Sequence, residues 1–132
     1  MSIINKFESY LSFSQAALDI KARRVQIISE NIVNASTPGF KAKDIDFAKL
    51  LNQHMANSRQ SQDGSAGGGR VSVQDIQSST YYRVPLSPSV DNNTVEIGVE
   101  QAKFGHASSD YQASLQMFES KLSGLFKALR GE

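Results

Sequence analysis

A seven-residue apolar repeat near the end of the chain constrains the fold more than any other sequence feature. Large apolar side chains recur at every seventh position from residue 97, and leucines join them at an alternating four-three step after residue 111. This spacing is typical of a long helix whose narrow apolar stripe lies against one neighbouring helix. We expect that helix from about Val95 to Arg130. The stripe, called here the C-terminal seam, consists of Ile97, Phe104, Tyr111, Leu115, Phe118, Leu122, Leu125 and Leu129.

The first region of the chain has the 3.6-residue period of a second long helix, expected from Ile3 to Ala35. Beside its main apolar stripe lies another, and together they cover roughly half of the helix circumference. An arc that broad indicates either burial inside a bundle or contact with two partners, one of them another subunit. The main stripe, called here the N-terminal stripe, consists of Leu11, Leu18, Val25, Ile28 and Ile32, and the second of Phe13, Ala17, Ile20 and Ile27.

A turn is predicted directly after the first helix. Thr37 precedes proline, which biases its backbone towards an extended conformation. Pro38 and Gly39 suit the two central positions of a type II turn, because proline fixes φ and glycine permits a positive φ. The helix is therefore expected to end near Ala35.

The lengths of the two predicted helices exclude a compact globule. They would be about 50 Å and about 54 Å long, whereas a compact chain of 132 residues is roughly 36 Å across. We therefore predict a mainly α protein in which the N- and C-terminal helices form an elongated antiparallel coiled coil. The expected units are an N-terminal helix over residues 1–36, an irregular or short-β middle region over 37–94 and a C-terminal helix over 95–132. Helices this long and apolar are expected to need other copies, and to be poorly ordered at their ends in a lone monomer.

The middle of the chain is polar. From Asn57 to Thr80, 14 of 24 residues are serine, glutamine or glycine, which is typical of a flexible loop. Short strands are expected only around Val71, Val73 and Tyr81 to Val84.

Composition and spacing exclude most chemistry. The net charge of +1 disfavours nucleic-acid binding, and the absence of cysteine excludes disulfides and thiolate sites. We expect no metal, cofactor or catalytic residue: His54 and His106 are interpreted as isolated surface side chains, and Asp44 and Asp46 as a solvated strand face. The cluster of Lys21, Arg23 and Arg24 would point to different sides of a helix, so it is also interpreted as solvated. No run of about 20 apolar residues predicts a membrane span, and the first residues do not form a cleavable signal peptide.

One segment at the end of the first helix resembles a known family. Residues Ser29-Glu-Asn-Ile-Val-Asn-Ala-Ser-Thr-Pro-Gly-Phe-Lys-Ala42 are similar to the N-terminal signature of bacterial flagellar rod and hook axial proteins. Val33 stands where that family usually has alanine, and Phe40 where tyrosine is common. The segments Lys41–Phe47, Tyr82–Pro85, Asp91–Glu96 and Tyr111–Leu115, with the short length, indicate a subunit of the proximal rod. The matching signature positions are Asn31, Asn34, Thr37, Pro38, Gly39 and Phe40.

The resemblance implies a structural role rather than catalysis. Such proteins are exported through the flagellar type III apparatus and polymerise helically in the periplasm into a hollow drive shaft. The implied partners are other copies, neighbouring rod proteins, the rod-to-membrane-ring adaptor, the export gate and the membrane ring. The alternatives are another short rod subunit and, less favoured, a coiled-coil export chaperone or adaptor.

The residues expected to carry assembly follow from both lines of reasoning. The N-terminal stripe should pack against the C-terminal seam from Tyr111 onwards, within or between subunits. Asn31 and Asn34 should form hydrogen bonds near the helix end. Pro38, Gly39 and Phe40 should set the direction in which the chain leaves the helix.

Overall fold

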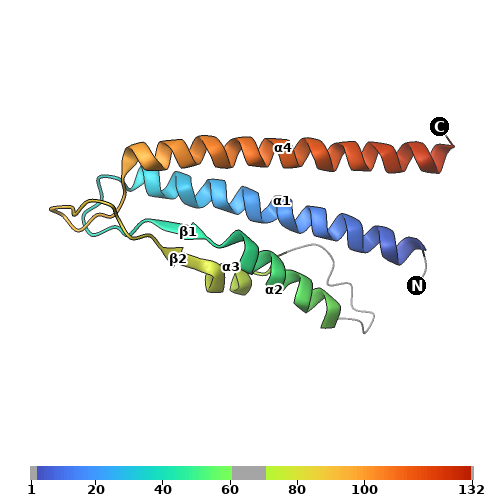
Figure 1. Cartoon of the computed structure of the whole chain (residues 1–132), viewed down its shortest axis with the longest axis horizontal. Helices are drawn as coiled ribbons and strands as arrows, with labels where there is room; N and C mark the ends of the chain where they lie inside the picture. The colour runs from blue at the N-terminus through green and yellow to red at the C-terminus, as the bar shows by residue number, and fades with distance from the viewer. Residues whose placement is uncertain (1–2, 61–70, 132) are drawn as a thin grey trace.

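The computed structural model describes residues 3–60 and 71–131. Two long helices, two short helices and a small two-stranded sheet form an elongated molecule (Figure 1). Along the chain the elements are α1 (Ile3–Val33), β1 (Lys43–Ile45), α2 (Phe47–Gln60), α3 (Val73–Ser79), β2 (Thr80–Tyr82) and α4 (Ile97–Arg130). The mainly helical class and both long helices are confirmed. α1 ends two residues before the expected Ala35, and α4 begins two residues after the expected Val95.

The two long helices run antiparallel. Both chain termini lie at the same end of the molecule in Figure 1. The Lys121 ammonium donates to Ser14 Oγ at 3.2 Å, and the Lys21 ammonium donates to Ser114 Oγ at 2.7 Å. The helices lie farthest apart at the end that carries the termini (Figure 1). No helix in the described part of the chain is apolar over enough length to span a membrane.

The face of α4 that packs on α1 differs from the predicted seam in its first half. Ile97 remains 50% exposed and Phe104 37% exposed, whereas Glu100 and Ala107 are buried. The small side chain of Ala107 allows α1 to approach closely, and Glu100 is held inside by polar partners described below. From Tyr111 to Leu125 the seam residues are half-buried, as predicted for a helix with one neighbour. Leu129, beyond them, is 74% exposed.

The opposite side of α1 is covered by the middle of the chain. The core there is formed by two α1 residues, Ile20 and Ile27, with Ile45 of β1 and Leu50 of α2. The molecule therefore has three layers, with α1 between α4 on one side and the middle region on the other (Figure 1). The second half of the apolar arc of α1 is thus covered on two sides by its own chain, whereas Phe13, nearer the N-terminus, remains 43% exposed. Partly buried side chains around this core are Phe47, Leu51, Val71 and Ile76.

The middle region is more ordered than its composition predicted. Helix α2 is an addition to the predicted elements. It begins after Asp46, whose carboxylate accepts a hydrogen bond from Lys49 N at 3.0 Å and so stabilises the first turn. The predicted loop also contains α3, whose N-cap Ser72 accepts from Asp75 N at 3.1 Å. Val73 belongs to this helix and not to a strand. The cluster of glycines at 64–69 lies outside the described residues.

The predicted strand near Tyr81 is confirmed in shortened form. β1 and β2 pair antiparallel, with Asp44 opposite Tyr81. The pairing joins the residues that follow the α1 turn to those that lead towards α4. Arg83 N extends the contact by donating to Ala42 O at 2.9 Å.

One histidine was interpreted wrongly. His54 is buried where α2 lies beside α1, and the interpretation of it as a surface side chain is wrong. Its position three residues after Leu51 and four after Leu50 puts it on the buried face of α2. His106 is exposed, as expected.

Candidate assembly site at the helix junction

The signature residue Asn31 fastens α1 to β1. Its side chain donates to Lys43 O at 2.8 Å and accepts from Lys43 N at 3.0 Å. The Asn31 amide therefore satisfies both backbone groups of Lys43, as a neighbouring strand would. The same amide donates to Glu100 of α4 at 3.2 Å. Asn31 is 1% exposed, and a buried amide with these partners fixes three elements relative to one another.

Two buried carboxylates face the same arginine beside Asn31. Asp44 and Glu100 are each 1% exposed. Arg83 lies between them, with Nη2 3.4 Å from Asp44 Oδ2 and Nη1 donating to Glu100 Oε1. Buried charges are tolerated only when they are paired in this way. The interpretation of Asp44 as a solvated residue is therefore wrong, while Asp46 is exposed.

Arg24 completes this charged cluster from α1. Its Nε donates to Asp44 Oδ1 at 3.1 Å and its Nη2 to Oδ2 at 3.4 Å, which is the two-pronged geometry that a guanidinium suits. The hydrogen bond to Asp44 raises the pKa of Arg24 above its usual value. Burial, and then the negative charge of Asp44, raise the pKa of Tyr81. Asn31, Arg24, Asp44, Arg83 and Glu100 are called here the junction cluster.

The predicted turn is present and is held by a second segment. Gly39 has φ +74, and Phe40 N donates to Thr37 O at 3.2 Å, as a type II turn requires. Gly39 N donates to Asp91 O at 2.9 Å, and Thr94 N donates to Phe40 O at 3.0 Å. The Asp91–Glu96 segment therefore crosses the turn.

Asn93 is a functional residue that sequence reasoning missed. It is buried, and its amide donates to the carbonyls of Asn34, Ala35 and Thr37 at 3.0, 2.9 and 2.8 Å. These carbonyls follow the last turn of α1, where helical partners end. Asn34 O and Thr37 O also accept from Thr37 N and Phe40 N, so the Asn93 amide adds to the turn's own hydrogen bonds. The side chain of Asn34 acts more locally. Its Nδ2 donates to Glu30 O at 2.8 Å, and its Oδ1 accepts from Thr37 Oγ1 at 3.1 Å.

A glycine in the turn and a glycine in α4 form a matched pair for substitution. An added Cβ would meet no atom within 4 Å at Gly39 or at Gly124, so only the backbone decides the outcome. Gly39→Ala should lower the free energy of unfolding by about 1–2 kcal/mol, because alanine resists the left-handed conformation. Gly124→Ala, within the last two turns of α4, should raise it by up to about 1 kcal/mol. Urea denaturation followed by circular dichroism measures both, and the same sign for the two variants would contradict the account.

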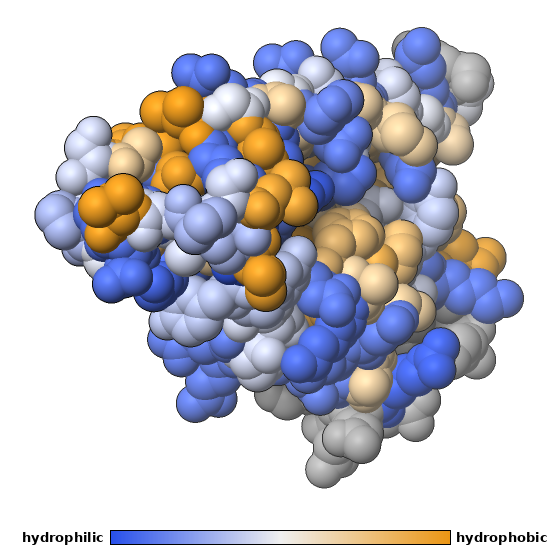
Figure 2. Space-filling model, turned by 60° about the vertical axis from the view of Figure 1, so that its left-hand side comes forward, coloured by the Kyte–Doolittle hydropathy of each residue, from blue (hydrophilic) through white to orange (hydrophobic). Residues whose placement is uncertain are grey.

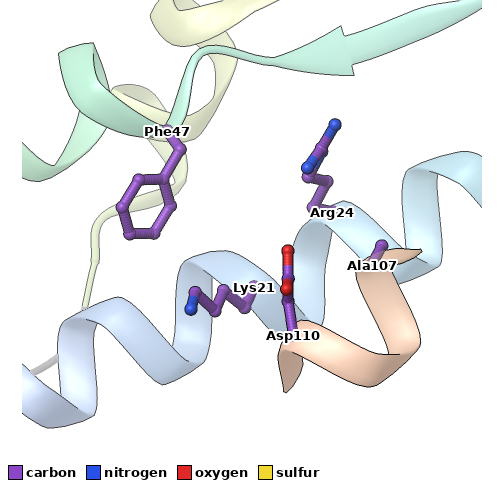
Figure 3. Close-up of a pocket in the computed structure, with 5 residues that line it drawn as sticks. All are labelled: Lys21, Arg24, Phe47, Ala107 and Asp110. Atoms are coloured by element: carbon purple, nitrogen blue, oxygen red, sulfur yellow. The ribbon is translucent and has the colours of Figure 1, made fainter. Parts of the chain in front are cut away.

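A cavity of about 290 Å³ lies next to the junction cluster. Figure 3 shows that Lys21 and Arg24 reach it from α1, Asp110 and Ala107 from α4, and Phe47 from the start of α2. The Lys21 ammonium lies 5.7 Å from the centre of the Phe47 ring. The cavity is open on one side, and its two cations already have partners: Lys21 donates to Ser114 and Arg24 to Asp44. The arrangement therefore supports packing rather than proton transfer. Among residues 3–60 and 71–131, no three His, Asp or Glu side chains are grouped closely enough to hold a metal ion.

The structure distributes the predicted packing residues unevenly. Ile28 is buried, and the other four members of the N-terminal stripe are half-buried. Phe40 is half-buried where it follows the turn, while Thr37, Pro38 and Gly39 are exposed. Among the residues of the C-terminal seam, the most exposed are its two ends, Ile97 and Leu129.

Comparison with known proteins agrees with this geometry. Residues 11–41, which include most of α1 and the turn, match the family described as flagella basal body rod protein. The FlgB protein of Aeromonas hydrophila is 39% identical over 132 residues, which cover 96% of each chain. The FlgB protein of Salmonella typhimurium is 36% identical over 136 residues, or 98% of this chain and 99% of the relative. That of Cereibacter sphaeroides is 36% identical over 130 residues, or 96% and 98%.

An antiparallel helix pair, with this signature turn at the end of its first helix, places the chain in the class of flagellar basal body rod proteins. The similarity extends through the middle region and α4 over nearly the full length of both proteins. The chain belongs to the FlgB family of these proteins.

Proposed function

We propose that this chain is a structural subunit of the proximal rod of the flagellar basal body. It polymerises helically with other subunits into the hollow shaft that transmits torque and surrounds the export channel. The observation that carries the proposal is near-full-length similarity to proteins named as FlgB basal body rod proteins. The two long helices add a physical reason, because an elongated unit with exposed apolar ends suits a polymer better than a catalyst.

In the assembled rod the helix pair acts as a coiled-coil unit. The N-terminal stripe and the half-buried part of the C-terminal seam pack within the subunit, and the exposed positions Ile97, Phe104 and Leu129 pack between subunits. The junction cluster and the turn set the angle of the middle region on the helix pair. The unit of residues 37–94 then forms the outer part of each subunit, with residues 1–36 and 95–132 closer to the channel.

The partners and the route follow from the same proposal. The chain passes through the flagellar type III apparatus without a cleaved signal peptide and assembles in the periplasm. It contacts other copies, the adjoining rod proteins, the rod-to-membrane-ring adaptor, the export gate and the membrane ring. It needs no metal or cofactor and is not an enzyme. Similarity to FlgB supports this role over that of another short rod subunit.

Purified basal bodies distinguish the rod subunit from an export chaperone or adaptor. Basal bodies are isolated from cells that carry the chain as the only copy of its gene, after extraction that removes soluble protein. We expect the chain to copurify with them, and a strain that lacks it to form no rod and be non-motile. A chain found only in the cytoplasmic fraction, with rods still assembled in its absence, would overturn the proposal.

A further inference from the structure

A groove lies between α1 and α2, towards the N-terminal end of α1. Its volume is about 420 Å³, and each of the two helices forms one wall. Phe13 of α1, which is 43% exposed, and the half-buried Met55 of α2 make the walls apolar. A volume of this size is typical of a ligand site. This feature is called here the α1–α2 groove.

The groove contains a buried polar atom without a partner. His54, on the α2 wall, is 6% exposed. Its Nε2 makes no hydrogen bond with any described residue. A buried nitrogen in this state destabilises a fold, because it has lost water and gained nothing in return. Its position at the wall of an open groove points to a ligand that supplies the missing hydrogen bond.

The remaining polar groups of the groove define the charge of that ligand. The hydroxyls of Ser9, Ser12 and Ser58 already donate to carbonyls of their own helices, at 3.0, 3.0 and 2.8 Å. Arg59, in the last turn of α2, is exposed and forms no ion pair within the described part of the chain. The described residues that line the groove include no acid. A carboxylate therefore suits it, because it can accept from both His54 and Arg59.

The groove differs in this respect from the apolar surface at the other end of the molecule. Figure 2 shows strongly hydrophobic side chains gathered at the junction end, where Val84, Leu86 and Val90 are almost completely exposed. Exposed apolar area by itself identifies no partner. In the α1–α2 groove, the buried nitrogen and the exposed cation specify the ligand.

The chain itself is a poor source of the carboxylate. Most acids of its described residues are already held within it, some by burial, as Asp44 and Glu100 are. Others accept hydrogen bonds from their own chain, as Asp46, Asp91 and Glu96 do. The complementary group is therefore better supplied by a different protein.

We propose that the α1–α2 groove binds an acidic, apolar segment of a different protein that adjoins this chain in the rod. An apolar side chain of that segment packs between Phe13 and Met55. A neighbouring Asp or Glu carboxylate accepts hydrogen bonds from His54 Nε2 and from the Arg59 guanidinium. The inference rests on the proposed function for the place where the two proteins meet.

A small carboxylate tests the chemistry of the groove on the purified full chain. The probe is phenylpropionate, which has an apolar ring and a carboxylate, and its control is the neutral phenylpropionamide. The chain has only two histidines, so NMR can follow the imidazole of His54 with the exposed His106 as internal reference. Phenylpropionate should shift the His54 signals alone and bind about tenfold more tightly than the amide, because an ionised acceptor forms the stronger hydrogen bonds. Equal affinities, or unchanged His54 signals, would overturn the proposal.

His54→Phe separates a binding role from a packing role. The phenyl ring removes the unpartnered nitrogen, and the adjoining groove leaves room for it, so the urea midpoint should stay the same or rise. The affinity for phenylpropionate should fall about tenfold. A lower urea midpoint with unchanged affinity would show that His54 only packs, and would contradict the assigned site.

Two arginine variants test the charge. Arg59→Gln should reduce the affinity for phenylpropionate to that of the amide and leave the amide unaffected. Arg130→Gln, which removes an exposed arginine of α4, should change neither affinity. The same loss in both variants would mean that the carboxylate responds to the overall charge of the chain and not to the groove.

Photo-cross-linking in cells tests the occupant. With p-benzoylphenylalanine in place of Ser58, purified basal bodies should contain an adduct between this chain and a second protein, at a segment that carries Asp or Glu. Arg59→Gln in the same chain should reduce the yield. An adduct only with another copy of the chain, or no adduct, would overturn the assigned partner.

The two readouts also separate this inference from the proposed function. If the chain is present in basal bodies but binds no phenylpropionate and forms no adduct, the groove is not a binding site and the rod assignment stands. If the chain binds phenylpropionate through His54 and Arg59 but is absent from basal bodies, the rod assignment is wrong and the carboxylate site stands.

Discussion

Replacing Arg83 by alanine should lower the free energy of unfolding by about 3–5 kcal/mol. The substitution leaves two buried carboxylates without the guanidinium that lies between them. Asp44 retains Arg24, whereas Glu100 retains only the amide of Asn31. Since a small domain is stable by about 5–15 kcal/mol in total, the variant should be partly unfolded at physiological temperature. Urea denaturation at neutral pH, followed by circular dichroism, measures the loss.

Arg23→Ala is the matched control for Arg83→Ala. Arg23 also pairs with a glutamate, Glu30, but at 3.6 Å and with both side chains substantially exposed. An exposed pair of this kind contributes about 0–1 kcal/mol. Adding Glu100→Gln to the Arg83→Ala variant should recover part of the stability, because it removes the uncompensated charge. Similar small losses for Arg83→Ala and Arg23→Ala would show that the junction cluster is not a structural centre.

Replacing Leu122 by aspartate should abolish rod assembly and motility. Leu122 is half-buried on α4 and lies within the predicted seam. A charge at this position must be desolvated wherever α4 packs, and it has no partner among the apolar side chains there. The measurement is swimming in soft agar, with electron microscopy of purified basal bodies from the same strain.

Two variants on the same helix control for the Leu122→Asp result. Gln116→Asp introduces the same charge at an exposed position and should leave motility intact. Leu122→Met keeps an apolar side chain of similar volume and should also assemble. Motile cells with normal rods in the Leu122→Asp strain would exclude a role for the seam in assembly.

The helix pair could be predicted because its signals are local. The apolar periods of α1 and α4 fix the helices, and Pro38 and Gly39 fix the turn that ends the first one. Helix α2 had a readable signal as well: Phe47, Leu50, Leu51 and His54 follow the i, i+3, i+4, i+7 spacing of a helical face. The polar composition of the following residues concealed it. A short amphipathic helix directly before a Ser/Gln/Gly segment is easily assigned to the loop.

The first half of α4 shows a limit of hydrophobic patterning. Glu100, Ala107, Ser114 and Lys121 also recur at every seventh position, and this polar and small series faces α1: two are buried, and two donate or accept hydrogen bonds with α1. Hydrophobicity alone cannot distinguish such a series from a solvated face, so the apolar period predicts Ile97 and Phe104 at the contact instead.

The candidate site depended on contacts across long sequence separations. Asp44 is buried because Arg24, 20 positions earlier, and Arg83, from the segment leading to α4, both reach it. Asn93 is 56–59 residues from the carbonyls that it caps. The family resemblance identified the segments that contain Asn31, Arg83 and Asn93, but only the fold shows that these segments bind one another.

A density map of intact basal bodies tests the central claim most directly. The account predicts that the proximal rod contains the antiparallel α1–α4 pair of this chain, identified by side-chain density such as the junction between Asp44, Arg83 and Glu100. It also predicts that the pair lies along the wall of the channel. A proximal rod whose density is fully explained by other proteins, with this chain absent from it, would contradict the account.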